Sequence, residues 1–192
     1  MFTEINLPKP SEKLINLIKN VATERPTNFG GKAVHDAVQQ VHRNNAAGEF
    51  FRTEEVTKLA LSEYQSYFYN NVIPTIGLLR NTRTDMPAAY APHSDRIRNV
   101  AINFYIDLGG SNVSTVFYDK YDPDNDLVGG YNAKYEDLTK VSEYFCNDST
   151  WYVFNSRQYH SVENIESTRV MLSLSLIGVN VKNIHNVMKN LA

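Results

Sequence analysis

Two histidines and one aspartate stand at positions from which they could bind a single metal ion. His93 and Asp95 are separated by one residue, so both side chains project to the same side of an extended segment. His160 follows 65 residues after Asp95, within another strand-like segment. Two imidazoles and one carboxylate are the facial triad that holds non-haem Fe(II) and leaves coordination positions open. The sequence therefore predicts a metal site formed by His93, Asp95 and His160.

Arg169 lies nine residues after His160 and could bind an anion beside this site. If residues 159–177 form a hairpin that turns over residues 165–166, His160 lies opposite Met171 and shares a face with Arg169. The guanidinium would then lie about 7 Å along the strand from that pair. Its planar fork is suited to binding the far carboxylate of a dicarboxylate. The residues expected on the opposite face are Val170, Leu172, Leu174 and Leu176.

Each of these residues also has a simpler interpretation. An isolated H-x-D sequence is common, and a single strand histidine is more often a hydrogen-bonded core residue than a ligand. Arg169 could pair with a nearby acid such as Glu163. The combination of the residues, in this order and on predicted strands, favours the metal site.

The elements that would position these residues change character near residue 74. Before it, apolar residues recur at helical spacing after Ser11, after Gly30-Gly31 and after Thr53. These stripes predict a supporting layer of helices over residues 1–74. Their members are Leu14, Ile15, Leu17, Ile18, Val21 and Ala22, then Val34, Ala37, Val38 and Val41, then Val56, Leu59, Ala60, Tyr64, Tyr67 and Phe68.

After Pro74 the apolar residues alternate with a period of two, which is typical of half-buried strands. Short strands at regular spacing predict an antiparallel jelly roll over residues 75–178, followed by a helix over 179–192. We find no repeat or linker and expect one domain, 1–192, of the α+β, mainly β, class. The expected strands are Ile76–Arg80, Arg98–Leu108, Val113–Tyr118, Trp151–Asn155, Tyr159–Glu163 and Arg169–Ile177.

The composition excludes several classes of protein. The chain of 192 residues has 19 Lys and Arg against 21 Asp and Glu, a formal net charge of −2, and one cysteine, Cys146. A single cysteine excludes an intrachain disulfide framework and a cysteine-based zinc cluster. The near-neutral balance disfavours binding to nucleic acid, which needs clustered basic residues. No segment is apolar enough for a signal peptide or a membrane span, so we expect a cytoplasmic protein without membrane contact.

The segments around the predicted triad resemble the Fe(II)/2-oxoglutarate-dependent dioxygenase family, within it the prolyl-4-hydroxylase-like branch. The resemblance covers roughly residues 75–178. The matching text is His93-Ser94-Asp95, Arg98 before the strand Ala101–Ile106, Trp151–Ser156 leading to His160-Ser161-Val162, and then Arg169 and Ser173.

This resemblance implies a double-stranded β-helix with N-terminal helices packed on one sheet, and iron on His93, Asp95 and His160. It implies that Arg169 binds the C5 carboxylate of 2-oxoglutarate. The further cosubstrate contacts that it implies are Tyr105, Ser173 and Asn103. The chain departs from the family in having Ala101 where relatives often have threonine, and Met171 where other branches have the serine of an R-x-S pair.

The activity that the resemblance implies is hydroxylation of a substrate by O2, with decarboxylation of 2-oxoglutarate to succinate and ascorbate as reductant. Amino-acid or peptidyl side chains are the favoured substrates. A cupin-like metal-binding jelly roll without oxygenase activity is one alternative, although it would need no clamp such as Arg169. A nucleic-acid demethylating oxygenase is another, and it would need a basic patch. The candidates for such a patch, or for contact with an anionic substrate, are Arg80, Arg83, Arg96 and Arg98. The oligomeric state stays open.

Two other features are expected to lie outside the metal site. Residues Asp122–Asp126 resemble the start of a calcium loop, but Leu127 and Ala133 stand where that loop needs glycine and glutamate. We interpret this segment as a solvated turn that could cover the site. The remaining histidines, His35, His42 and His185, have no predicted metal role.

Overall fold

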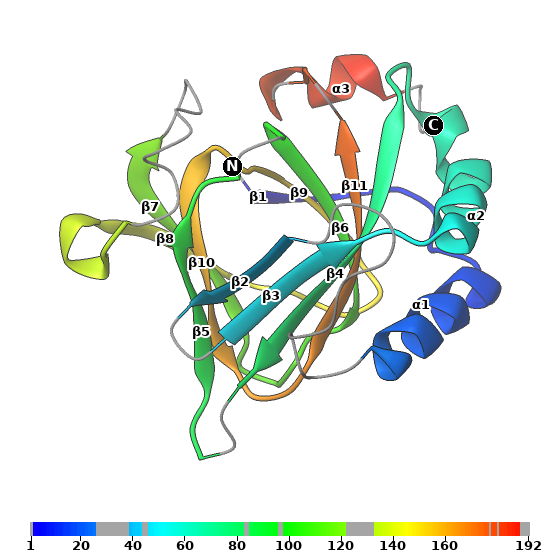
Figure 1. The fold of residues 1–192 in the computed structure, drawn as a ribbon. Coiled ribbons are helices and arrows are strands. Elements are labelled where there is room, and N and C mark those ends of the chain that lie inside the picture. The colour runs from blue at the N-terminus through cyan, green and yellow to red at the C-terminus, as the bar shows by residue number, and fades with distance from the viewer. Residues whose placement is uncertain are drawn as a thin grey trace.

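The structure is a computed structural model that describes residues 2–25, 39–43, 46–82, 85–95, 98–121, 133–176, 178–179 and 181–188. These residues form two antiparallel sheets that face each other (Figure 1). The larger sheet has the order β1 (Phe2–Ile5), β9 (Trp151–Asn155), β6 (Val100–Asp107), β11 (Arg169–Leu176), β4 (Val72–Asn81), β3 (Ala46–Phe51) and β2 (Gln39–Arg43). The smaller sheet has the order β5 (Ala88–His93), β10 (Gln158–Ile165), β7 (Ser114–Tyr121) and β8 (Lys140–Phe145).

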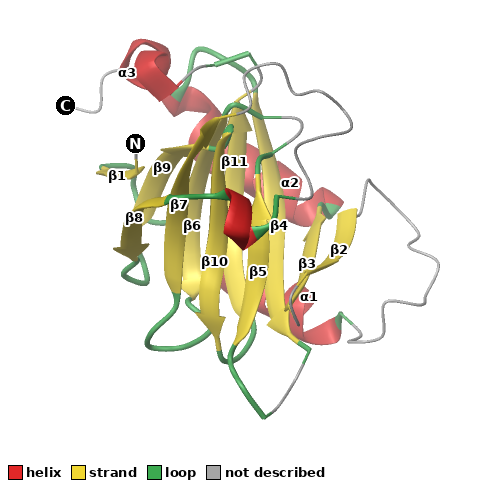
Figure 2. Ribbon diagram, turned by 90° about the vertical axis from the view of Figure 1, so that its left-hand side faces the viewer, coloured by secondary structure: helices red, strands yellow, loops and turns green. Residues whose placement is uncertain are grey.

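Two helices, α1 (Glu12–Glu24) and α2 (Glu54–Tyr64), cover the outer face of the larger sheet. Figure 2 shows them beyond both sheets when the smaller sheet faces the viewer. The hydroxyl of Ser11 accepts a hydrogen bond from Leu14 N, and that of Thr53 accepts one from Val56 N. These N-caps satisfy backbone donors that a first helical turn leaves free. The predicted starts of both helices are confirmed.

The alternation of β6 and β11 separates two layers of side chains. Val100, Ile102 and Phe104 pack with the helices, as do Val170, Leu172, Leu174 and Leu176. Tyr105 and Met171 lie on the other faces of the same strands and pack against Tyr90 and Val162 of the smaller sheet. The sequence therefore predicted correctly which residues of these strands face the second sheet.

The predicted hairpin over residues 159–177 is wrong. β10 pairs with β5 and β7 in the smaller sheet, whereas β11 pairs with β4 and β6 in the larger one. The connection between β10 and β11 crosses from one sheet to the other, where the amides of Glu166 and Ser167 donate to the carbonyl of Gly109. A period of two determines which side of a strand is buried but not which strand lies beside it. Arg169 still lies on the face of its sheet that is turned toward the other sheet. Every second residue of a strand points to that face, whichever of the two sheets the strand belongs to.

The N-terminal region is less helical than its stripes suggested. Val41 lies in β2 rather than in a helix, and β1 and β3 also belong to residues 1–74. The third stripe is helical only to Tyr64, and Tyr67 lies in a 3-10 turn, Gln65–Tyr67. At the other end, the described residues of the expected helix over 179–192 include a 3-10 turn, Val181–Asn183, and the short α3, Ile184–Val187.

Several positions named above lie outside the described residues. They are Gly30-Gly31 and the residues Val34, Ala37 and Val38 of the second predicted helix, His35, Arg83, Arg96, the segment Asp122–Asp126 with Leu127, Ile177, and the side chains of His42 and His185. Within the described part of the chain, no helix is long and apolar enough to cross a membrane.

Candidate active site

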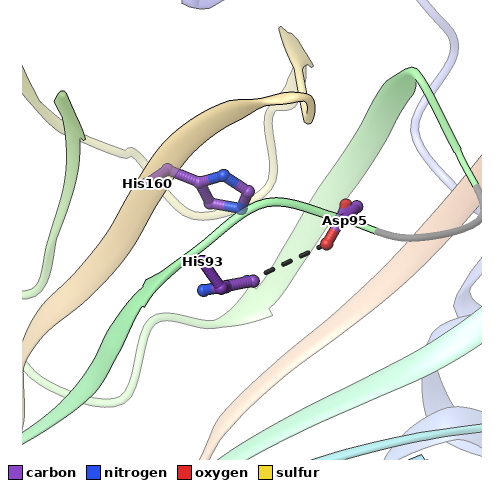
Figure 3. Close-up of side chains that lie close together, drawn as sticks. All are labelled: His93, Asp95 and His160. Atoms are coloured by element: carbon purple, nitrogen blue, oxygen red, sulfur yellow. Dashed lines mark ion pairs between the residues drawn. The ribbon is translucent and has the colours of Figure 1, made fainter. Parts of the chain in front are cut away.

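The three predicted metal ligands come together between the sheets (Figure 3). His160 of β10 lies directly opposite His93 at the end of β5, and the centres of the two rings are 4.4 Å apart. Asp95 follows β5, and its Oδ1 lies 3.8 Å from Nε2 of His93. One ligand atom from each residue lies within 4.8 Å of the other two. The predicted convergence of His93, Asp95 and His160 is confirmed.

Backbone carbonyls hold both imidazole rings in the orientation that metal binding requires. Nδ1 of His93 lies 2.9 Å from the carbonyl of Ala91, and Nδ1 of His160 lies 2.9 Å from that of Gln158. Because a carbonyl can only accept, each Nδ1 carries the proton and each Nε2 carries a lone pair in place of one. Metal-binding histidines are fixed in this way by partners of their second nitrogen.

Arg98 holds the carboxylate of Asp95. Its Nε donates to Oδ2 of Asp95 over 2.6 Å. Burial alone would raise the pKa of Asp95, but the charge of Arg98, smaller electrostatic contributions from His160 and His93, and the hydrogen bond from Arg98 keep that pKa below its ordinary value. Asp95 is therefore an anion, as a ligand to a divalent cation must be.

Arg169 is buried, and part of its guanidinium has no hydrogen-bond partner among the described residues. It is 1% exposed, and the guanidinium carbon lies 4.1 Å from the centre of the Tyr105 ring. Nη2 donates to the sulfur of Cys146 over 3.6 Å, whereas Nε and Nη1 find no partner among the residues that the structure describes. A buried guanidinium with unsatisfied N–H groups is costly unless an anion pairs with it. The chemistry of these donors fits a carboxylate.

Thr115 and Cys146 stand beside this arginine, and the sequence reasoning missed both. The Cys146 thiol interacts with Arg169, Tyr105 and Thr115, and burial raises its pKa. The buried hydroxyl of Thr115 makes no hydrogen bond within the described part of the chain. Burial also raises the pKa of Tyr105 to about 12, so its phenol keeps its proton and can donate. Thr115 could have been found from the alternation of residues 113–118, but Cys146 lies outside any strand and carries no such signal.

Ser173 and Asn103 are linked to Asp95 through Arg98. The hydroxyl of Ser173 accepts a hydrogen bond from Nη1 of Arg98 and donates to Oδ1 of Asn103 over 2.7 Å. Four residues separate Ser173 from Arg169 along β11, about 13 Å at the usual rise of a strand. The structure therefore joins Ser173 and Asn103 to the Asp95 end of the site.

The two described arginines of the predicted cluster, Arg80 and Arg98, do not lie on one surface. Arg80 turns to the helix side, where Nη2 lies 3.3 Å from the carbonyl of Ala22 and Nη1 lies 3.9 Å from a carboxylate oxygen of Glu49. Arg98 instead belongs to the site between the sheets. The expectation that Arg80 meets a substrate is wrong, because β4 turns this side chain towards α1.

No family model and no curated protein sequence matches the chain. Solved structures do match it. The non-haem α-ketoglutarate-dependent epimerase SnoN from nogalamycin biosynthesis has a TM-score of 0.55 at 13% identity, over 92% of this chain and 78% of that one. AviO1 from Streptomyces viridochromogenes Tue57 has a TM-score of 0.50 at 16% identity, over 92% and 89% of the chains. A prolyl hydroxylase from Trichoplax adhaerens has a TM-score of 0.50 at 14% identity, over 92% and 83%.

The chain has the jelly-roll fold of 2-oxoglutarate oxygenases. The fold class predicted from the sequence is confirmed. The N-terminal helices, predicted to pack on one sheet, lie on the larger sheet.

Proposed function

We propose that this protein is an Fe(II)- and 2-oxoglutarate-dependent oxygenase. The observation that carries the proposal is the pairing of two incomplete sites between the same sheets. One is a His-Asp-His cluster with its ligand atoms within 4.8 Å of one another, and the other is a buried arginine with two unsatisfied nitrogens. A metal ion and a dicarboxylate that chelates it would complete both.

In this proposal each residue has a separate task. His93, Asp95 and His160 hold the iron, and Arg169 binds the C5 carboxylate of the cosubstrate. Tyr105 and Thr115 supply neutral donors beside that carboxylate, and the inner faces of the two sheets exclude water from it. When bound, iron and 2-oxoglutarate supply the oxidising chemistry with O2, and ascorbate keeps the metal reduced. The products are succinate, CO2 and an oxidised substrate.

The solved structures support this choice of ligands. One SnoN structure holds Fe3+ and α-ketoglutarate, and the Trichoplax prolyl hydroxylase is seen with a peptide fragment of a hypoxia-inducible factor. We propose that the substrate is an amino-acid or peptidyl side chain that is hydroxylated in the cytoplasm. The shared fold alone does not determine the substrate.

Two alternatives are less well supported. A cupin-like metal-binding protein without oxygenase activity has no use for a buried arginine with unsatisfied donors. A nucleic-acid demethylating oxygenase needs a basic surface, yet the net charge is −2 and Arg80 is engaged with Glu49.

The test separates metal binding, cosubstrate binding and turnover. Wild-type protein should bind Fe(II) and then 2-oxoglutarate without O2, and should form succinate when O2 and ascorbate are added. His160→Ala should abolish metal binding, whereas His185→Ala, which changes a histidine of α3, should leave it intact. A protein that binds metal but neither binds nor consumes 2-oxoglutarate would contradict the proposal and favour the cupin-like alternative.

A further inference from the structure

We propose that Arg98 is a positioning residue that makes Asp95 a one-oxygen ligand to the metal. This inference rests on the proposed function only in requiring a metal ion on His93, Asp95 and His160. It adds a residue whose task is to keep a coordination position open.

The two oxygens of Asp95 have different surroundings. Oδ2 accepts a charged hydrogen bond from Nε of Arg98 over 2.6 Å. Oδ1 lies on the side of the imidazoles, 3.8 Å from Nε2 of His93. The guanidinium uses one lone pair of Oδ2 and fixes the plane of the carboxylate, so Oδ1 is the oxygen best placed to bind an ion. The side chains of Asp95 and Arg98 are 17% and 12% exposed, so little water competes for this pair.

Arg98 is itself anchored at both ends. Its Nη1 donates to the hydroxyl of Ser173 on β11, which in turn donates to Asn103 on β6. Its backbone carbonyl accepts a hydrogen bond from the hydroxyl of Ser156 over 2.8 Å. The planar guanidinium can make two such bonds in fixed directions, which a lysine ammonium cannot reproduce. The larger sheet therefore sets the orientation of the Asp95 carboxylate.

The way in which Asp95 binds determines how many positions on the metal stay open to other ligands. A facial triad is useful because it leaves positions open for other ligands. If Asp95 bound through both oxygens, it would occupy one of those positions. Without Arg98 the carboxylate is free to rotate and to bind in that way, and the metal loses the support of an outer partner. Loss of such partners typically weakens metal binding about 10- to 100-fold.

The experiment uses Co(II), because its visible absorption reports the number and arrangement of its ligands. Arg98→Met should weaken Co(II) binding about 10- to 100-fold and change the absorption per bound ion, since a second carboxylate oxygen then takes a position that water otherwise fills. Arg98→Lys keeps the charge but loses the fork, and Ser173→Ala removes only the anchor. Both should give smaller changes of the same kind.

Arg157→Met is the matched control. Arg157 holds the same segment through Oδ1 of Asn99 over 2.7 Å and the backbone carbonyl of Asp95 over 3.4 Å, without touching the carboxylate. It should alter the Co(II) spectrum little. Thermal unfolding of the metal-free variants checks that each is folded, and if Arg98→Met is not folded, Arg98→Lys and Ser173→Ala decide.

Two results would overturn the proposal while leaving the oxygenase intact. One is wild-type affinity and spectrum in the Arg98 variants, and the other is an equal loss of affinity in Arg98→Met and Arg157→Met with unchanged spectra, which would indicate a merely structural role. Failure of the wild-type protein to show His160-dependent Co(II) binding would instead remove the metal site, and both proposals with it.

Discussion

The guanidinium carbon of Arg169 lies 4.1 Å from the centre of the Tyr105 ring, although 64 residues separate the two in sequence. Their strands are neighbours in the larger sheet, where Tyr105 of β6 lies opposite Met171 of β11. The face of an aromatic ring attracts a cation, by about 0.5–2 kcal/mol, but it does not use up the in-plane N–H groups. Tyr105 therefore stabilises the buried arginine and leaves its donors available to an anion.

This arrangement predicts that Arg169 serves the cosubstrate and not the metal. Arg169→Ala should weaken 2-oxoglutarate binding about tenfold or more, because charged hydrogen bonds contribute about 1.5–3 kcal/mol each. Metal affinity should stay within about twofold, since coupling between sites that share no ligand is small. Calorimetric titrations without O2, of Mn(II) into the metal-free protein and of 2-oxoglutarate into the Mn(II)-loaded protein, measure the two affinities. Tyr105→Phe, which keeps the ring and loses only the hydroxyl, is the control and should cost less. Equal loss of metal and cosubstrate in Arg169→Ala would contradict the separate roles.

The sequence predicts which residues share a face of a strand, but it does not predict which strands pair with one another. Arg169 and Met171 were assigned to one face and Val170 and Leu172 to the other, and this division holds because side-chain direction alternates along any strand. His160 and Arg169 were assigned to one hairpin, yet they belong to opposite sheets. Both arrangements bury the same alternate residues, so the hydrophobic pattern cannot distinguish them.

The same limit applies to the residues that surround the metal ligands. Arg98 donates to Ser173, which follows it by 75 residues in the sequence, and an isolated arginine before a strand carries no signal of such a contact. Val41 shows the converse error, since the last residue of a short stripe at helical spacing lies in β2. Short apolar runs fit a helix and a strand equally well until packing decides between them.

A close approach between β3 and β5 predicts that Gly48 tolerates no larger residue. A Cβ at Gly48 would lie 2.5 Å from Cε2 of Tyr90, so the ring would have to move. Tyr90 is 4% exposed and packs edge-on against His93, with ring centres 4.9 Å apart. Gly48→Ala should lower the free energy of unfolding by about 1–3 kcal/mol, measured by urea denaturation, and should weaken metal binding through His93.

The second variant in this test removes the ring. Gly48→Ala combined with Tyr90→Leu should be less destabilised than the sum of the two single changes, because the clash is absent. Additive losses would show that Tyr90 is not the obstacle.

Cys146 reports on the cosubstrate end of the site. Its thiol is 7% exposed, touches Nη2 of Arg169 and has a pKa raised by burial. Because the thiolate is the species that reacts, iodoacetamide should label the native protein more slowly than the urea-unfolded protein. The labelling rate of the native protein should still climb at pH values where that of the unfolded protein has levelled off, since a raised pKa moves ionisation to higher pH.

Addition of Mn(II) and 2-oxoglutarate should slow labelling further, because a carboxylate on Arg169 shields the thiol and adds negative charge beside it. Intact mass over time measures each rate without ambiguity, since the chain has a single cysteine. The Arg169→Ala protein is the control, and it should lose the protection by 2-oxoglutarate. Labelling that is insensitive to 2-oxoglutarate in a protein that binds it would place the C5 carboxylate away from Cys146 and Arg169.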